Sequence, residues 1–260
     1  MNETIKISII TPSYNQGEFI EQTIQSVLSQ TYKNIEYIIV DGGSTDNTLE
    51  IIDKYRDRID IIISEKDKGQ SDAINKGFKL ATGTLVGWIN SDDLLYPDCV
   101  EQMVKLYTEY PDGSIYYPIL LDYIDRKGKL LHKSTRTIPN RNHLLNRNYS
   151  VTQQGSFYNT HLVKQIGYLD ESIYYCMDLD LWLRLLNENG KIYGYKPHAL
   201  AAFRIWEDTK TAQAGSRFLQ NTKQVLDRQG AMTFSKAKLH LFYIAFRIWG
   251  GKIKRRVMKK

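Results

Sequence analysis

Cysteine is scarce in this sequence of 260 residues, which contains only Cys99 and Cys176. Two cysteines are too few for a disulfide framework, so the composition favours folding in a reducing cytoplasm, although a single bridge between the two stays open. Long apolar runs are also missing: the longest near the C-terminus, residues 239–246, is far shorter than the roughly 20 residues that cross a bilayer. The first residues show no basic start followed by an apolar run, so we expect neither an export signal nor a spanning helix.

Acidic residues are absent from residues 228–260, which contain ten basic ones. The net charge of +6 comes from this tail, because residues 1–227 carry 25 basic against 29 acidic side chains. A basic face spread over the whole molecule would favour nucleic acid as a partner, and this pattern does not. It favours instead a local attachment of the tail to anionic lipid or another polyanion.

Four short runs rich in isoleucine and valine alternate with segments whose apolar residues have helical spacing. This order predicts an α/β fold with a Rossmann-like, mainly parallel central sheet flanked by helices, because connections of that length join parallel strands. The predicted strands are Ile5–Thr11, Glu36–Asp41, Ile59–Ser64 and Leu85–Asn90, and the predicted helices between them are Phe19–Gln30, Asn47–Tyr55 and Ser71–Leu80. Farther along we predict a helix over Asp98–Tyr110, a strand over Ser114–Leu121, a hairpin turn at Asp125–Gly128 and a helix that starts near Asp178.

Polar residues collect where each of the four predicted strands ends, at the edge where parallel sheets bind ligands. Asp41 ends the second strand, and its carboxylate can accept hydrogen bonds from a base or ribose, whereas Asp46 suits the cap of the next helix. Asp92 and Asp93 follow the fourth strand, and their mutual repulsion is costly unless a cation or hydroxyl donors lie beside them. A solvated turn that caps the next helix is the alternative for this pair.

Three of these loops together resemble the inverting glycosyltransferases of family 2, which have the GT-A fold. The matching segments are Thr-Pro-Ser-Tyr-Asn at 11–15, Val-Asp-Gly-Gly-Ser-Thr-Asp at 40–46 and Asn-Ser-Asp-Asp at 90–93, in the family's order and spacing. Residues 67–77 also look like the family's third donor loop, and residues 150–211 match more loosely. The resemblance implies a single GT-A catalytic domain over 1–227, with a nucleotide-sugar-binding half at 1–105 and an acceptor-binding half at 106–227, followed by a basic amphipathic tail at 228–260.

By that resemblance, one group of residues would bind the nucleotide-sugar donor. Asp92 would contact the ribose or the sugar, and Asp93 would be the ligand of a divalent cation, Mn²⁺ or Mg²⁺, that stabilises the charge on the leaving diphosphate. Lys68, near a helix N-terminus, suits the diphosphate, with a solvated lysine as the alternative. The predicted donor-binding set is Thr11, Pro12, Tyr14, Asn15, Asp41, Gly43, Ser44, Lys68, Gly69, Asp72, Asn90, Ser91 and Asp92.

Inverting transfer needs one carboxylate base that takes the proton of the attacking hydroxyl, with no covalent enzyme intermediate. Asp178 falls on the position of the family's catalytic Asp, although Met177 stands where the family usually has Glu. Asp180 is the alternative base, and a purely structural cap is the alternative for Asp178. The predicted acceptor-binding set is Gln154, Asp180 and Trp182.

Residues 203–211 look like the mobile segment that closes over the donor diphosphate in this family. Trp206 stands where relatives often carry His, so we expect no histidine metal ligand from this loop. Arg204 or Lys210 would neutralise phosphate instead, with a structural salt bridge as the alternative for either side chain.

The tail combines its basic residues with apolar ones at helical spacing, namely Leu239, Phe242, Tyr243, Phe246, Trp249 and Ile253. A helix of this kind lies in the headgroup region of an anionic membrane. We therefore expect a cytoplasmic protein that is peripheral on the inner face of the cell membrane. A helix that packs on the catalytic body, with a solvated basic end, is the alternative.

Together these features predict an enzyme that transfers a sugar from a nucleotide-diphosphate donor to a hydroxyl of a glycan or lipid-linked saccharide, in surface polysaccharide biosynthesis. UDP is the expected nucleotide because the family uses it most often, with GDP and dTDP as alternatives. A catalytically inactive nucleotide- or glycan-binding module and a polyprenyl-phosphate sugar synthase are the competing interpretations. A P-loop kinase is not expected because the sequence has no G-x-x-x-x-G-K-[ST] motif.

Overall fold

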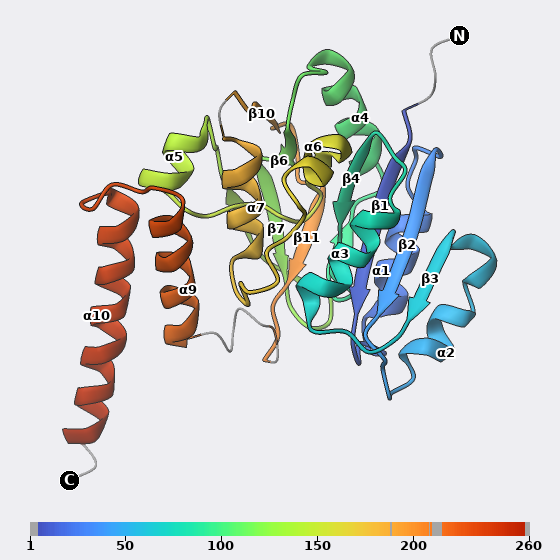
Figure 1. Cartoon of the computed structure of the whole chain (residues 1–260). Helices are drawn as coiled ribbons and strands as arrows, with labels where there is room; N and C mark the ends of the chain where they lie inside the picture. Colours follow the sequence, from blue (N-terminus) through green and yellow to red (C-terminus); the bar gives the residue numbers. More distant parts are fainter. Residues whose placement is uncertain (1–4, 188, 208, 210–214, 258–260) are drawn as a thin grey trace.

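The computed structural model describes residues 5–187, 189–207, 209 and 215–257, with side chains described up to residue 247. Its largest element is a seven-stranded sheet in the order β10-β6-β9-β4-β1-β2-β3. A second, smaller sheet has four strands in the order β5-β11-β7-β8. Helices cover the large sheet, and the last two helices lie at the end of the molecule opposite β3 (Figure 1).

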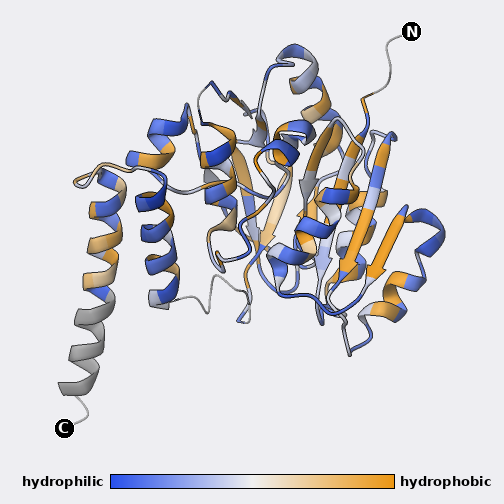
Figure 2. Cartoon of the chain, in the orientation of Figure 1, coloured by the Kyte–Doolittle hydropathy of each residue, from blue (hydrophilic) through white to orange (hydrophobic). Residues whose placement is uncertain are grey.

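The first half of the chain forms the parallel part of the large sheet, as the sequence predicts. Strands β3, β2, β1 and β4 are neighbours in that order, and all three pairings between them are parallel. Figure 2 shows β2 and β3 as strongly hydrophobic, which is typical of strands covered by helices. Their bounds are β1 Ile7–Ser13, α1 Ile20–Leu28, β2 Ile35–Asp41, α2 Thr48–Asp53, a 3₁₀ turn at Arg56–Arg58, β3 Ile61–Ser64, α3 Gln70–Leu80 and β4 Leu85–Trp88.

The second half of the chain completes the same sheet. Strand β9 pairs antiparallel with both β4 and β6, and β6 pairs parallel with β10, so the sheet is mixed at this end. The predicted division at residue 105 falls inside α4, and the strands beyond it extend the sheet that begins before it. The bounds are β5 Leu94–Leu95, α4 Cys99–Glu109, β6 Ile115–Pro118, α5 Arg141–Asn146, β9 Phe157–Asn159, α6 Thr160–Gln165, α7 Met177–Leu185 and β10 Ile192–Tyr195.

The prediction of one strand over Ser114–Leu121 is wrong. The chain forms β6 up to Pro118 and then β7 (Leu120–Ile124), and the two belong to different sheets. Between them, the N–H of Ile119 still donates to the carbonyl of Tyr195 beside β6, after which β7 pairs with β8 (Leu130–Thr135) and β11 (Ala201–Arg204). The predicted hairpin turn after β7 is confirmed, with Gly128 at a positive φ of 84° that suits a residue without a Cβ.

Two hydrophobic clusters lie on the two faces of the large sheet, because neighbouring residues of a strand point to opposite sides. Ile10 and Ile38 belong to the cluster that also contains residues of α3, α7 and α9 (Gly215–Arg228). Ile9 and Ile39 belong to the cluster that contains residues of α1 and α4. Cys99 and Cys176 are buried free thiols, one in each cluster, so no disulfide joins the two sides.

The last helix, α10 (Lys236–Val257), packs against α9 and α5. In Figure 1 it runs antiparallel to α9 and extends to the C-terminal end of the chain. The predicted helical tail is therefore present, and its first part rests on the body. Trp249, Ile253 and the basic residues beyond Arg247 have side chains outside the described set. Within the part of the chain that the structure describes, no helix combines the length and apolarity that a membrane span needs.

A buried carboxylate ties the start of the large sheet together, at the edge opposite the strand ends that carry the polar loops. Glu36, in β2, accepts hydrogen bonds from Ser8 of β1, from the backbone and hydroxyl of Thr82 before β4, and from Lys6. Burial alone would raise the pKa of Glu36, but these hydrogen bonds outweigh it and lower the pKa to about 2. The ionised carboxylate therefore stabilises the folded sheet.

This arrangement predicts a pH-dependent stability. Because the pKa of Glu36 is lower in the folded chain than in the unfolded one, its contribution is complete above about pH 4.5 and disappears as the pH falls towards 2. Glu36→Gln should lower the free energy of unfolding by about 2 kcal/mol at pH 7 and by much less near pH 2. Urea unfolding of both proteins across this pH range measures the difference. A difference that does not vary with pH would contradict the assignment.

Candidate active site

A cavity of about 640 Å³ lies where the strands of the large sheet end. Its walls come from the residues after β1 and β4, the start of α3, the start of α7, the segment before β9 and the residues after β11. The volume is in the range of pockets that bind a cofactor or a small substrate. Eight of the predicted site residues line it, namely Pro12, Tyr14, Gly69, Asn90, Ser91, Asp92, Gln154 and Asp178.

The loop after β2 does not line the cavity but supports the loop that does. The fully buried Asp41 carboxylate accepts hydrogen bonds from the backbone N–H groups of Gly43 and Ser44, both at 3.0 Å, and from the Ser64 hydroxyl at 2.9 Å. Ser44 in turn accepts a hydrogen bond from the N–H of Asn15, at 2.8 Å. The carboxylate that we expected to contact the base or ribose thus holds the turn beneath residues 12–14.

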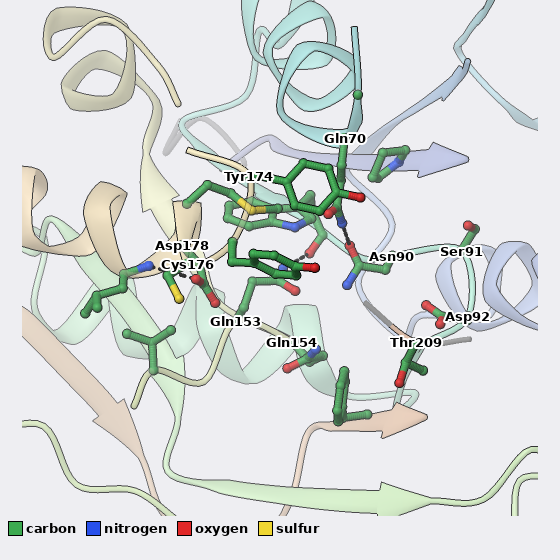
Figure 3. A pocket seen from close by; sticks show the side chains of 18 of the residues that line it. Gln70, Asn90, Ser91, Asp92, Gln153, Gln154, Tyr174, Cys176, Asp178 and Thr209 are labelled. Carbon is green, nitrogen blue, oxygen red and sulfur yellow. Dashed lines mark hydrogen bonds between the residues drawn. The ribbon is translucent and has the colours of Figure 1, made fainter. Parts of the chain in front are cut away.

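Other predicted donor residues are also not among those that line the cavity. Thr11 is buried, with its hydroxyl 3.0 Å from that of Tyr37. Lys68 is exposed, and its backbone N–H donates to Asp72 at the start of α3. Asp72 thus holds the residue that precedes the N-cap of α3, and a hydrogen bond of 2.8 Å from Gln70 to Asn90 joins the start of α3 to the loop after β4 (Figure 3). The predicted donor-binding residues that do not line the cavity are Thr11, Asn15, Asp41, Gly43, Ser44, Lys68 and Asp72.

The two adjacent carboxylates after β4 have opposite surroundings, and Asp93, the predicted metal ligand, is not among the residues that line the cavity. Asp93 is fully buried and accepts hydrogen bonds from the Arg204 N–H at 2.9 Å, Gln154 at 3.0 Å and Asn90 at 3.1 Å. Burial and the neighbouring charge of Asp92 raise the pKa of Asp93, and these hydrogen bonds oppose that rise. Because its oxygens already accept three hydrogen bonds inside the protein, the carboxylate that is left to face a ligand is that of Asp92.

Asp92 lines the cavity and accepts a hydrogen bond from the side chain of Trp206. The indole N–H of Trp206 donates to Asp92 Oδ2 at 3.0 Å, and the Trp206 ring packs against Phe19 with 4.9 Å between ring centroids. Burial raises the pKa of Asp92, and the hydrogen bond from Trp206 opposes that rise. Trp206 thus orients the carboxylate from the position where relatives often carry His.

Arg204 does not face the cavity. Its guanidinium is buried and donates to the backbone carbonyls of Asp92 and Arg126, at 2.7 and 2.9 Å. The partners of the Arg204 guanidinium are thus carbonyl groups of the protein, and the expected salt bridge is not among its contacts in the described residues. Lys210, the other predicted phosphate partner, lies outside the described residues.

The single carboxylate of Asp92 suits a divalent cation that takes most of its ligands from a substrate. Among the described residues, no three His, Cys, Asp or Glu side chains form a group that could hold a metal ion. Mg²⁺ is commonly held by one or two carboxylates together with substrate phosphates, so one cavity-facing carboxylate is compatible with such binding. Asp92 is the residue that would supply it.

Asp178 enters the cavity from the opposite side. It is the second residue of α7, half-buried, and its Oδ1 accepts the N–H of Leu179 at 2.8 Å. A helix N-terminus favours an ionised carboxylate because the helix dipole and the exposed N–H groups are positive there. In Figure 3, Asp178 and Asp92 lie on opposite sides of the cavity, with Gln154 between them. The predicted base thus lines the same cavity as Asp92.

The structure corrects two of the three predicted acceptor contacts. Residues two apart on a helix point in different directions, and Asp180 turns away from Asp178 into a buried ion pair with Arg184 at 2.7 Å. Trp182 is fully buried and donates its indole N–H to the Tyr158 hydroxyl. Both side chains belong to the core, and only Gln154 of the predicted set lines the cavity.

Sequence reasoning missed most of the wall on the side of Asp178. Tyr123, Tyr149, Tyr174 and Tyr175 line it, and Tyr174 is 62% exposed. Arg136 is the one Lys, Arg or His among the described lining residues, and it donates to the carbonyl of Val151 at 2.6 Å. The pair Tyr174-Tyr175 just before Asp178 is the local signal that the sequence offered, whereas Arg136 has none.

Comparisons with known proteins show the family of the chain. The family model described as "Glycosyl transferase family 2" matches residues 8–165, more than half of the chain. An uncharacterized glycosyltransferase of Rickettsia typhi is 30% identical over 212 residues, which is 79% of this chain and 66% of the relative. The glycosyltransferase GlyA of Streptococcus pneumoniae is 26% identical over 233 residues, which is 78% of this chain and 32% of the relative. The chain thus spans less than two thirds of these relatives.

Two solved structures show the fold. S. aureus TarS, residues 1–349, in complex with UDP-GlcNAc, has a TM-score of 0.68 and 20% identity over 92% of this chain and 70% of that one. The mannosyltransferase PcManGT from Pyrobaculum calidifontis, in complex with GDP-Man and Mn²⁺, also has a TM-score of 0.68, with 16% identity over 94% of this chain and 70% of that one. The predicted GT-A fold is therefore confirmed.

Because the two carboxylates have different surroundings, we expect their replacement by Asn to lower the free energy of unfolding by different amounts. Asp93→Asn should lower the free energy of unfolding by about 3 kcal/mol, because an amide cannot accept all three buried hydrogen bonds. Asp92→Asn, the matched control, should lower it by less than about 1 kcal/mol, because an amide oxygen still accepts from Trp206. Urea unfolding measures both. An equal loss in the two variants would show that the buried network is not specific to Asp93.

Proposed function

The chain belongs to glycosyl transferase family 2, and we propose that it transfers a sugar from a nucleoside diphosphate to an acceptor hydroxyl, with inversion at the sugar carbon. The observation that carries this proposal is that Asp92 and Asp178 line one cavity from opposite sides (Figure 3). Such a cavity accommodates a donor beside the first carboxylate and an acceptor beside the second. The donor and the acceptor then meet between two acidic residues with separate tasks.

On the donor side, the proposed contacts come from the end of β1, the loops after β1 and β4, and the residue before α3. Pro12 and Tyr14 offer an apolar and an aromatic surface for a base, and Gly69 lets a ligand approach the start of α3. UDP is the proposed nucleotide: TarS was determined with UDP-GlcNAc, and the family resemblance favours it. The GDP-Man complex of PcManGT keeps GDP as an alternative.

The proposed cofactor is Mn²⁺ or Mg²⁺, held by Asp92. The Mn²⁺ in the PcManGT complex supports a metal on this fold, and the cavity-facing carboxylate of Asp92 provides a ligand for it. Such an ion supplies electrostatic stabilisation of the negative charge that develops on the diphosphate. Trp206 contributes by fixing Asp92 through the hydrogen bond from its ring.

Asp178 is the proposed general base. It takes the proton of the acceptor hydroxyl as the hydroxyl oxygen bonds to the sugar carbon and the bond from that carbon to the diphosphate oxygen breaks. The nucleoside diphosphate leaves with the electron pair of the broken bond, and no enzyme atom bonds to the sugar. Single displacement of this kind inverts the configuration at the carbon.

The acceptor side fits a saccharide. Tyrosines on one wall offer aromatic faces, and the amide of Gln154 can donate and accept hydrogen bonds with hydroxyl groups. Arg136 adds a positive charge to this wall, which suits an acceptor that carries an acidic group. We therefore propose a glycan or a lipid-linked saccharide as acceptor, in surface polysaccharide synthesis.

The donor proposal predicts metal-dependent nucleotide binding. UDP at saturating concentration with Mn²⁺ should raise the melting temperature by about 5 °C, a shift that chelator or Asp92→Asn removes. A thermal-shift panel of UDP, GDP, dTDP and CMP, each with and without Mn²⁺, measures this and chooses the base. No shift with any nucleotide would overturn the donor proposal. A shift without any turnover would favour the inactive binding module.

The base proposal predicts a separation of binding from turnover. Asp178→Asn should lower kcat about 1,000-fold or more while the nucleotide-induced shift stays at the wild-type size, because the change touches only proton transfer. Turnover is followed as release of nucleoside diphosphate from the selected donor with saccharide acceptors. Asp180→Asn is the matched control, and it should lower stability through its ion pair yet keep kcat within a few-fold. Undiminished turnover of Asp178→Asn would remove this residue from the mechanism.

A further inference from the structure

Helix α10 has apolar residues on two opposite faces, and the body of the protein covers only one of them. At about 3.6 residues per turn, Ala237, Leu241 and Ile244 share one face. Ala237 and Leu241 are buried in the cluster under α7 and α9, and Ile244 packs against it. This inner face attaches the helix to the rest of the molecule.

The outer face is half a turn away and is exposed. Leu239, Phe242 and Tyr243 lie there, with 55%, 72% and 56% of their surfaces exposed. The turn that leads into the helix adds Met232 and Phe234, which are 64% and 86% exposed. Large apolar side chains gathered in this way mark an interaction surface, because single scattered ones are the norm elsewhere.

The charges beside this face are positive. Lys236 and Arg247 are exposed on the same helix. Beyond the described side chains, the helix sequence continues with Lys252, Lys254, Arg255 and Arg256, and residues 228–260 contain no acidic residue. Apolar side chains flanked by cations are the composition of helices that lie in the headgroup layer of an anionic bilayer.

We propose that the outer face of α10, together with Met232 and Phe234, docks the protein onto an anionic lipid surface. A second copy of the chain fits this face less well, because symmetric pairing of two such helices would place their cations side by side. The surface is connected to the cavity through α9. Phe218 of α9, the helix against which α10 packs, lines the cavity wall. Docking would therefore hold the cavity near the lipid surface, although the inference does not depend on the proposed reaction.

The test is co-sedimentation of the full chain with vesicles of phosphatidylcholine alone or with about 30% phosphatidylglycerol. The wild type should bind the anionic vesicles at least about tenfold more strongly than the neutral ones, and about 0.5 M salt should weaken that binding. The double variant Leu239→Ser, Phe242→Ser should lose at least about tenfold in partitioning. The control variant Leu130→Ser, Leu131→Ser removes two exposed apolar residues of β8 and should bind like the wild type.

Two results would overturn the proposal. Equal binding of the α10 double variant and the wild type would exclude the outer face, and so would a wild type that binds neither kind of vesicle. Sedimentation velocity without lipid completes the test: a wild-type dimer that the α10 variant converts to a monomer would assign the face to a second copy. Melting temperatures with and without nucleotide confirm that each variant is folded, and they keep a failure here separate from a failure of the donor proposal.

Discussion

A buried pair of residues, Asp93 and Arg204, holds the walls of the cavity together, and the backbone N–H of Arg204 donates to the Asp93 carboxylate. The carboxylate of Asp93 accepts hydrogen bonds from the β4 loop, from the segment before β9 and from the end of β11, and its backbone carbonyl accepts one from Thr23 of α1. Arg204 extends this network to the β7–β8 hairpin through the carbonyl of Arg126. Burying polar groups is costly, and this cost is offset here because nearly all the hydrogen-bonding positions of the two side chains are used.

The role of Asp92 depends on this buried pair. Because Asp93 is fixed inside, the chain must direct the preceding carboxylate the other way, towards the cavity and Trp206. The carbonyl of Asp92 accepts from the Arg204 guanidinium at 2.7 Å, so the backbone at this point has little freedom. A preorganised carboxylate is favourable for catalysis because it does not have to reorient as charge develops on a leaving group. The two adjacent aspartates thus differ: Asp93 supports the fold of the cavity walls, and Asp92 is the residue to which we assign a role in the proposed reaction.

The parallel half of the sheet could be predicted from the sequence because its signals are local. Each strand is a short apolar run, and each loop carries its polar residues next to the strand that positions them. The division at Pro118 and Ile119 could not be predicted, since it depends on β10 and β11, which are some 75 residues away in the chain. For the same reason the burial of Asp93 could not be predicted, because its partner Arg204 is 111 residues away in the chain. The position of Arg136 on the cavity wall could not be predicted either, because no local pattern distinguishes this residue.

The C-terminal helices belong to the candidate site as well as to the tail. Asn221 of α9 accepts the backbone N–H of Tyr175 at 3.2 Å, and the Thr222 hydroxyl lies 3.0 Å from the sulfur of Cys176. Tyr175 and Cys176 immediately precede α7. Cys176 has a left-handed φ of 61°, a conformation that costs energy in a residue with a Cβ. Contacts from α9 therefore hold the strained turn from which Asp178 enters the cavity. Because α10 packs on α9, whatever binds α10 acts on a helix that supports the proposed base.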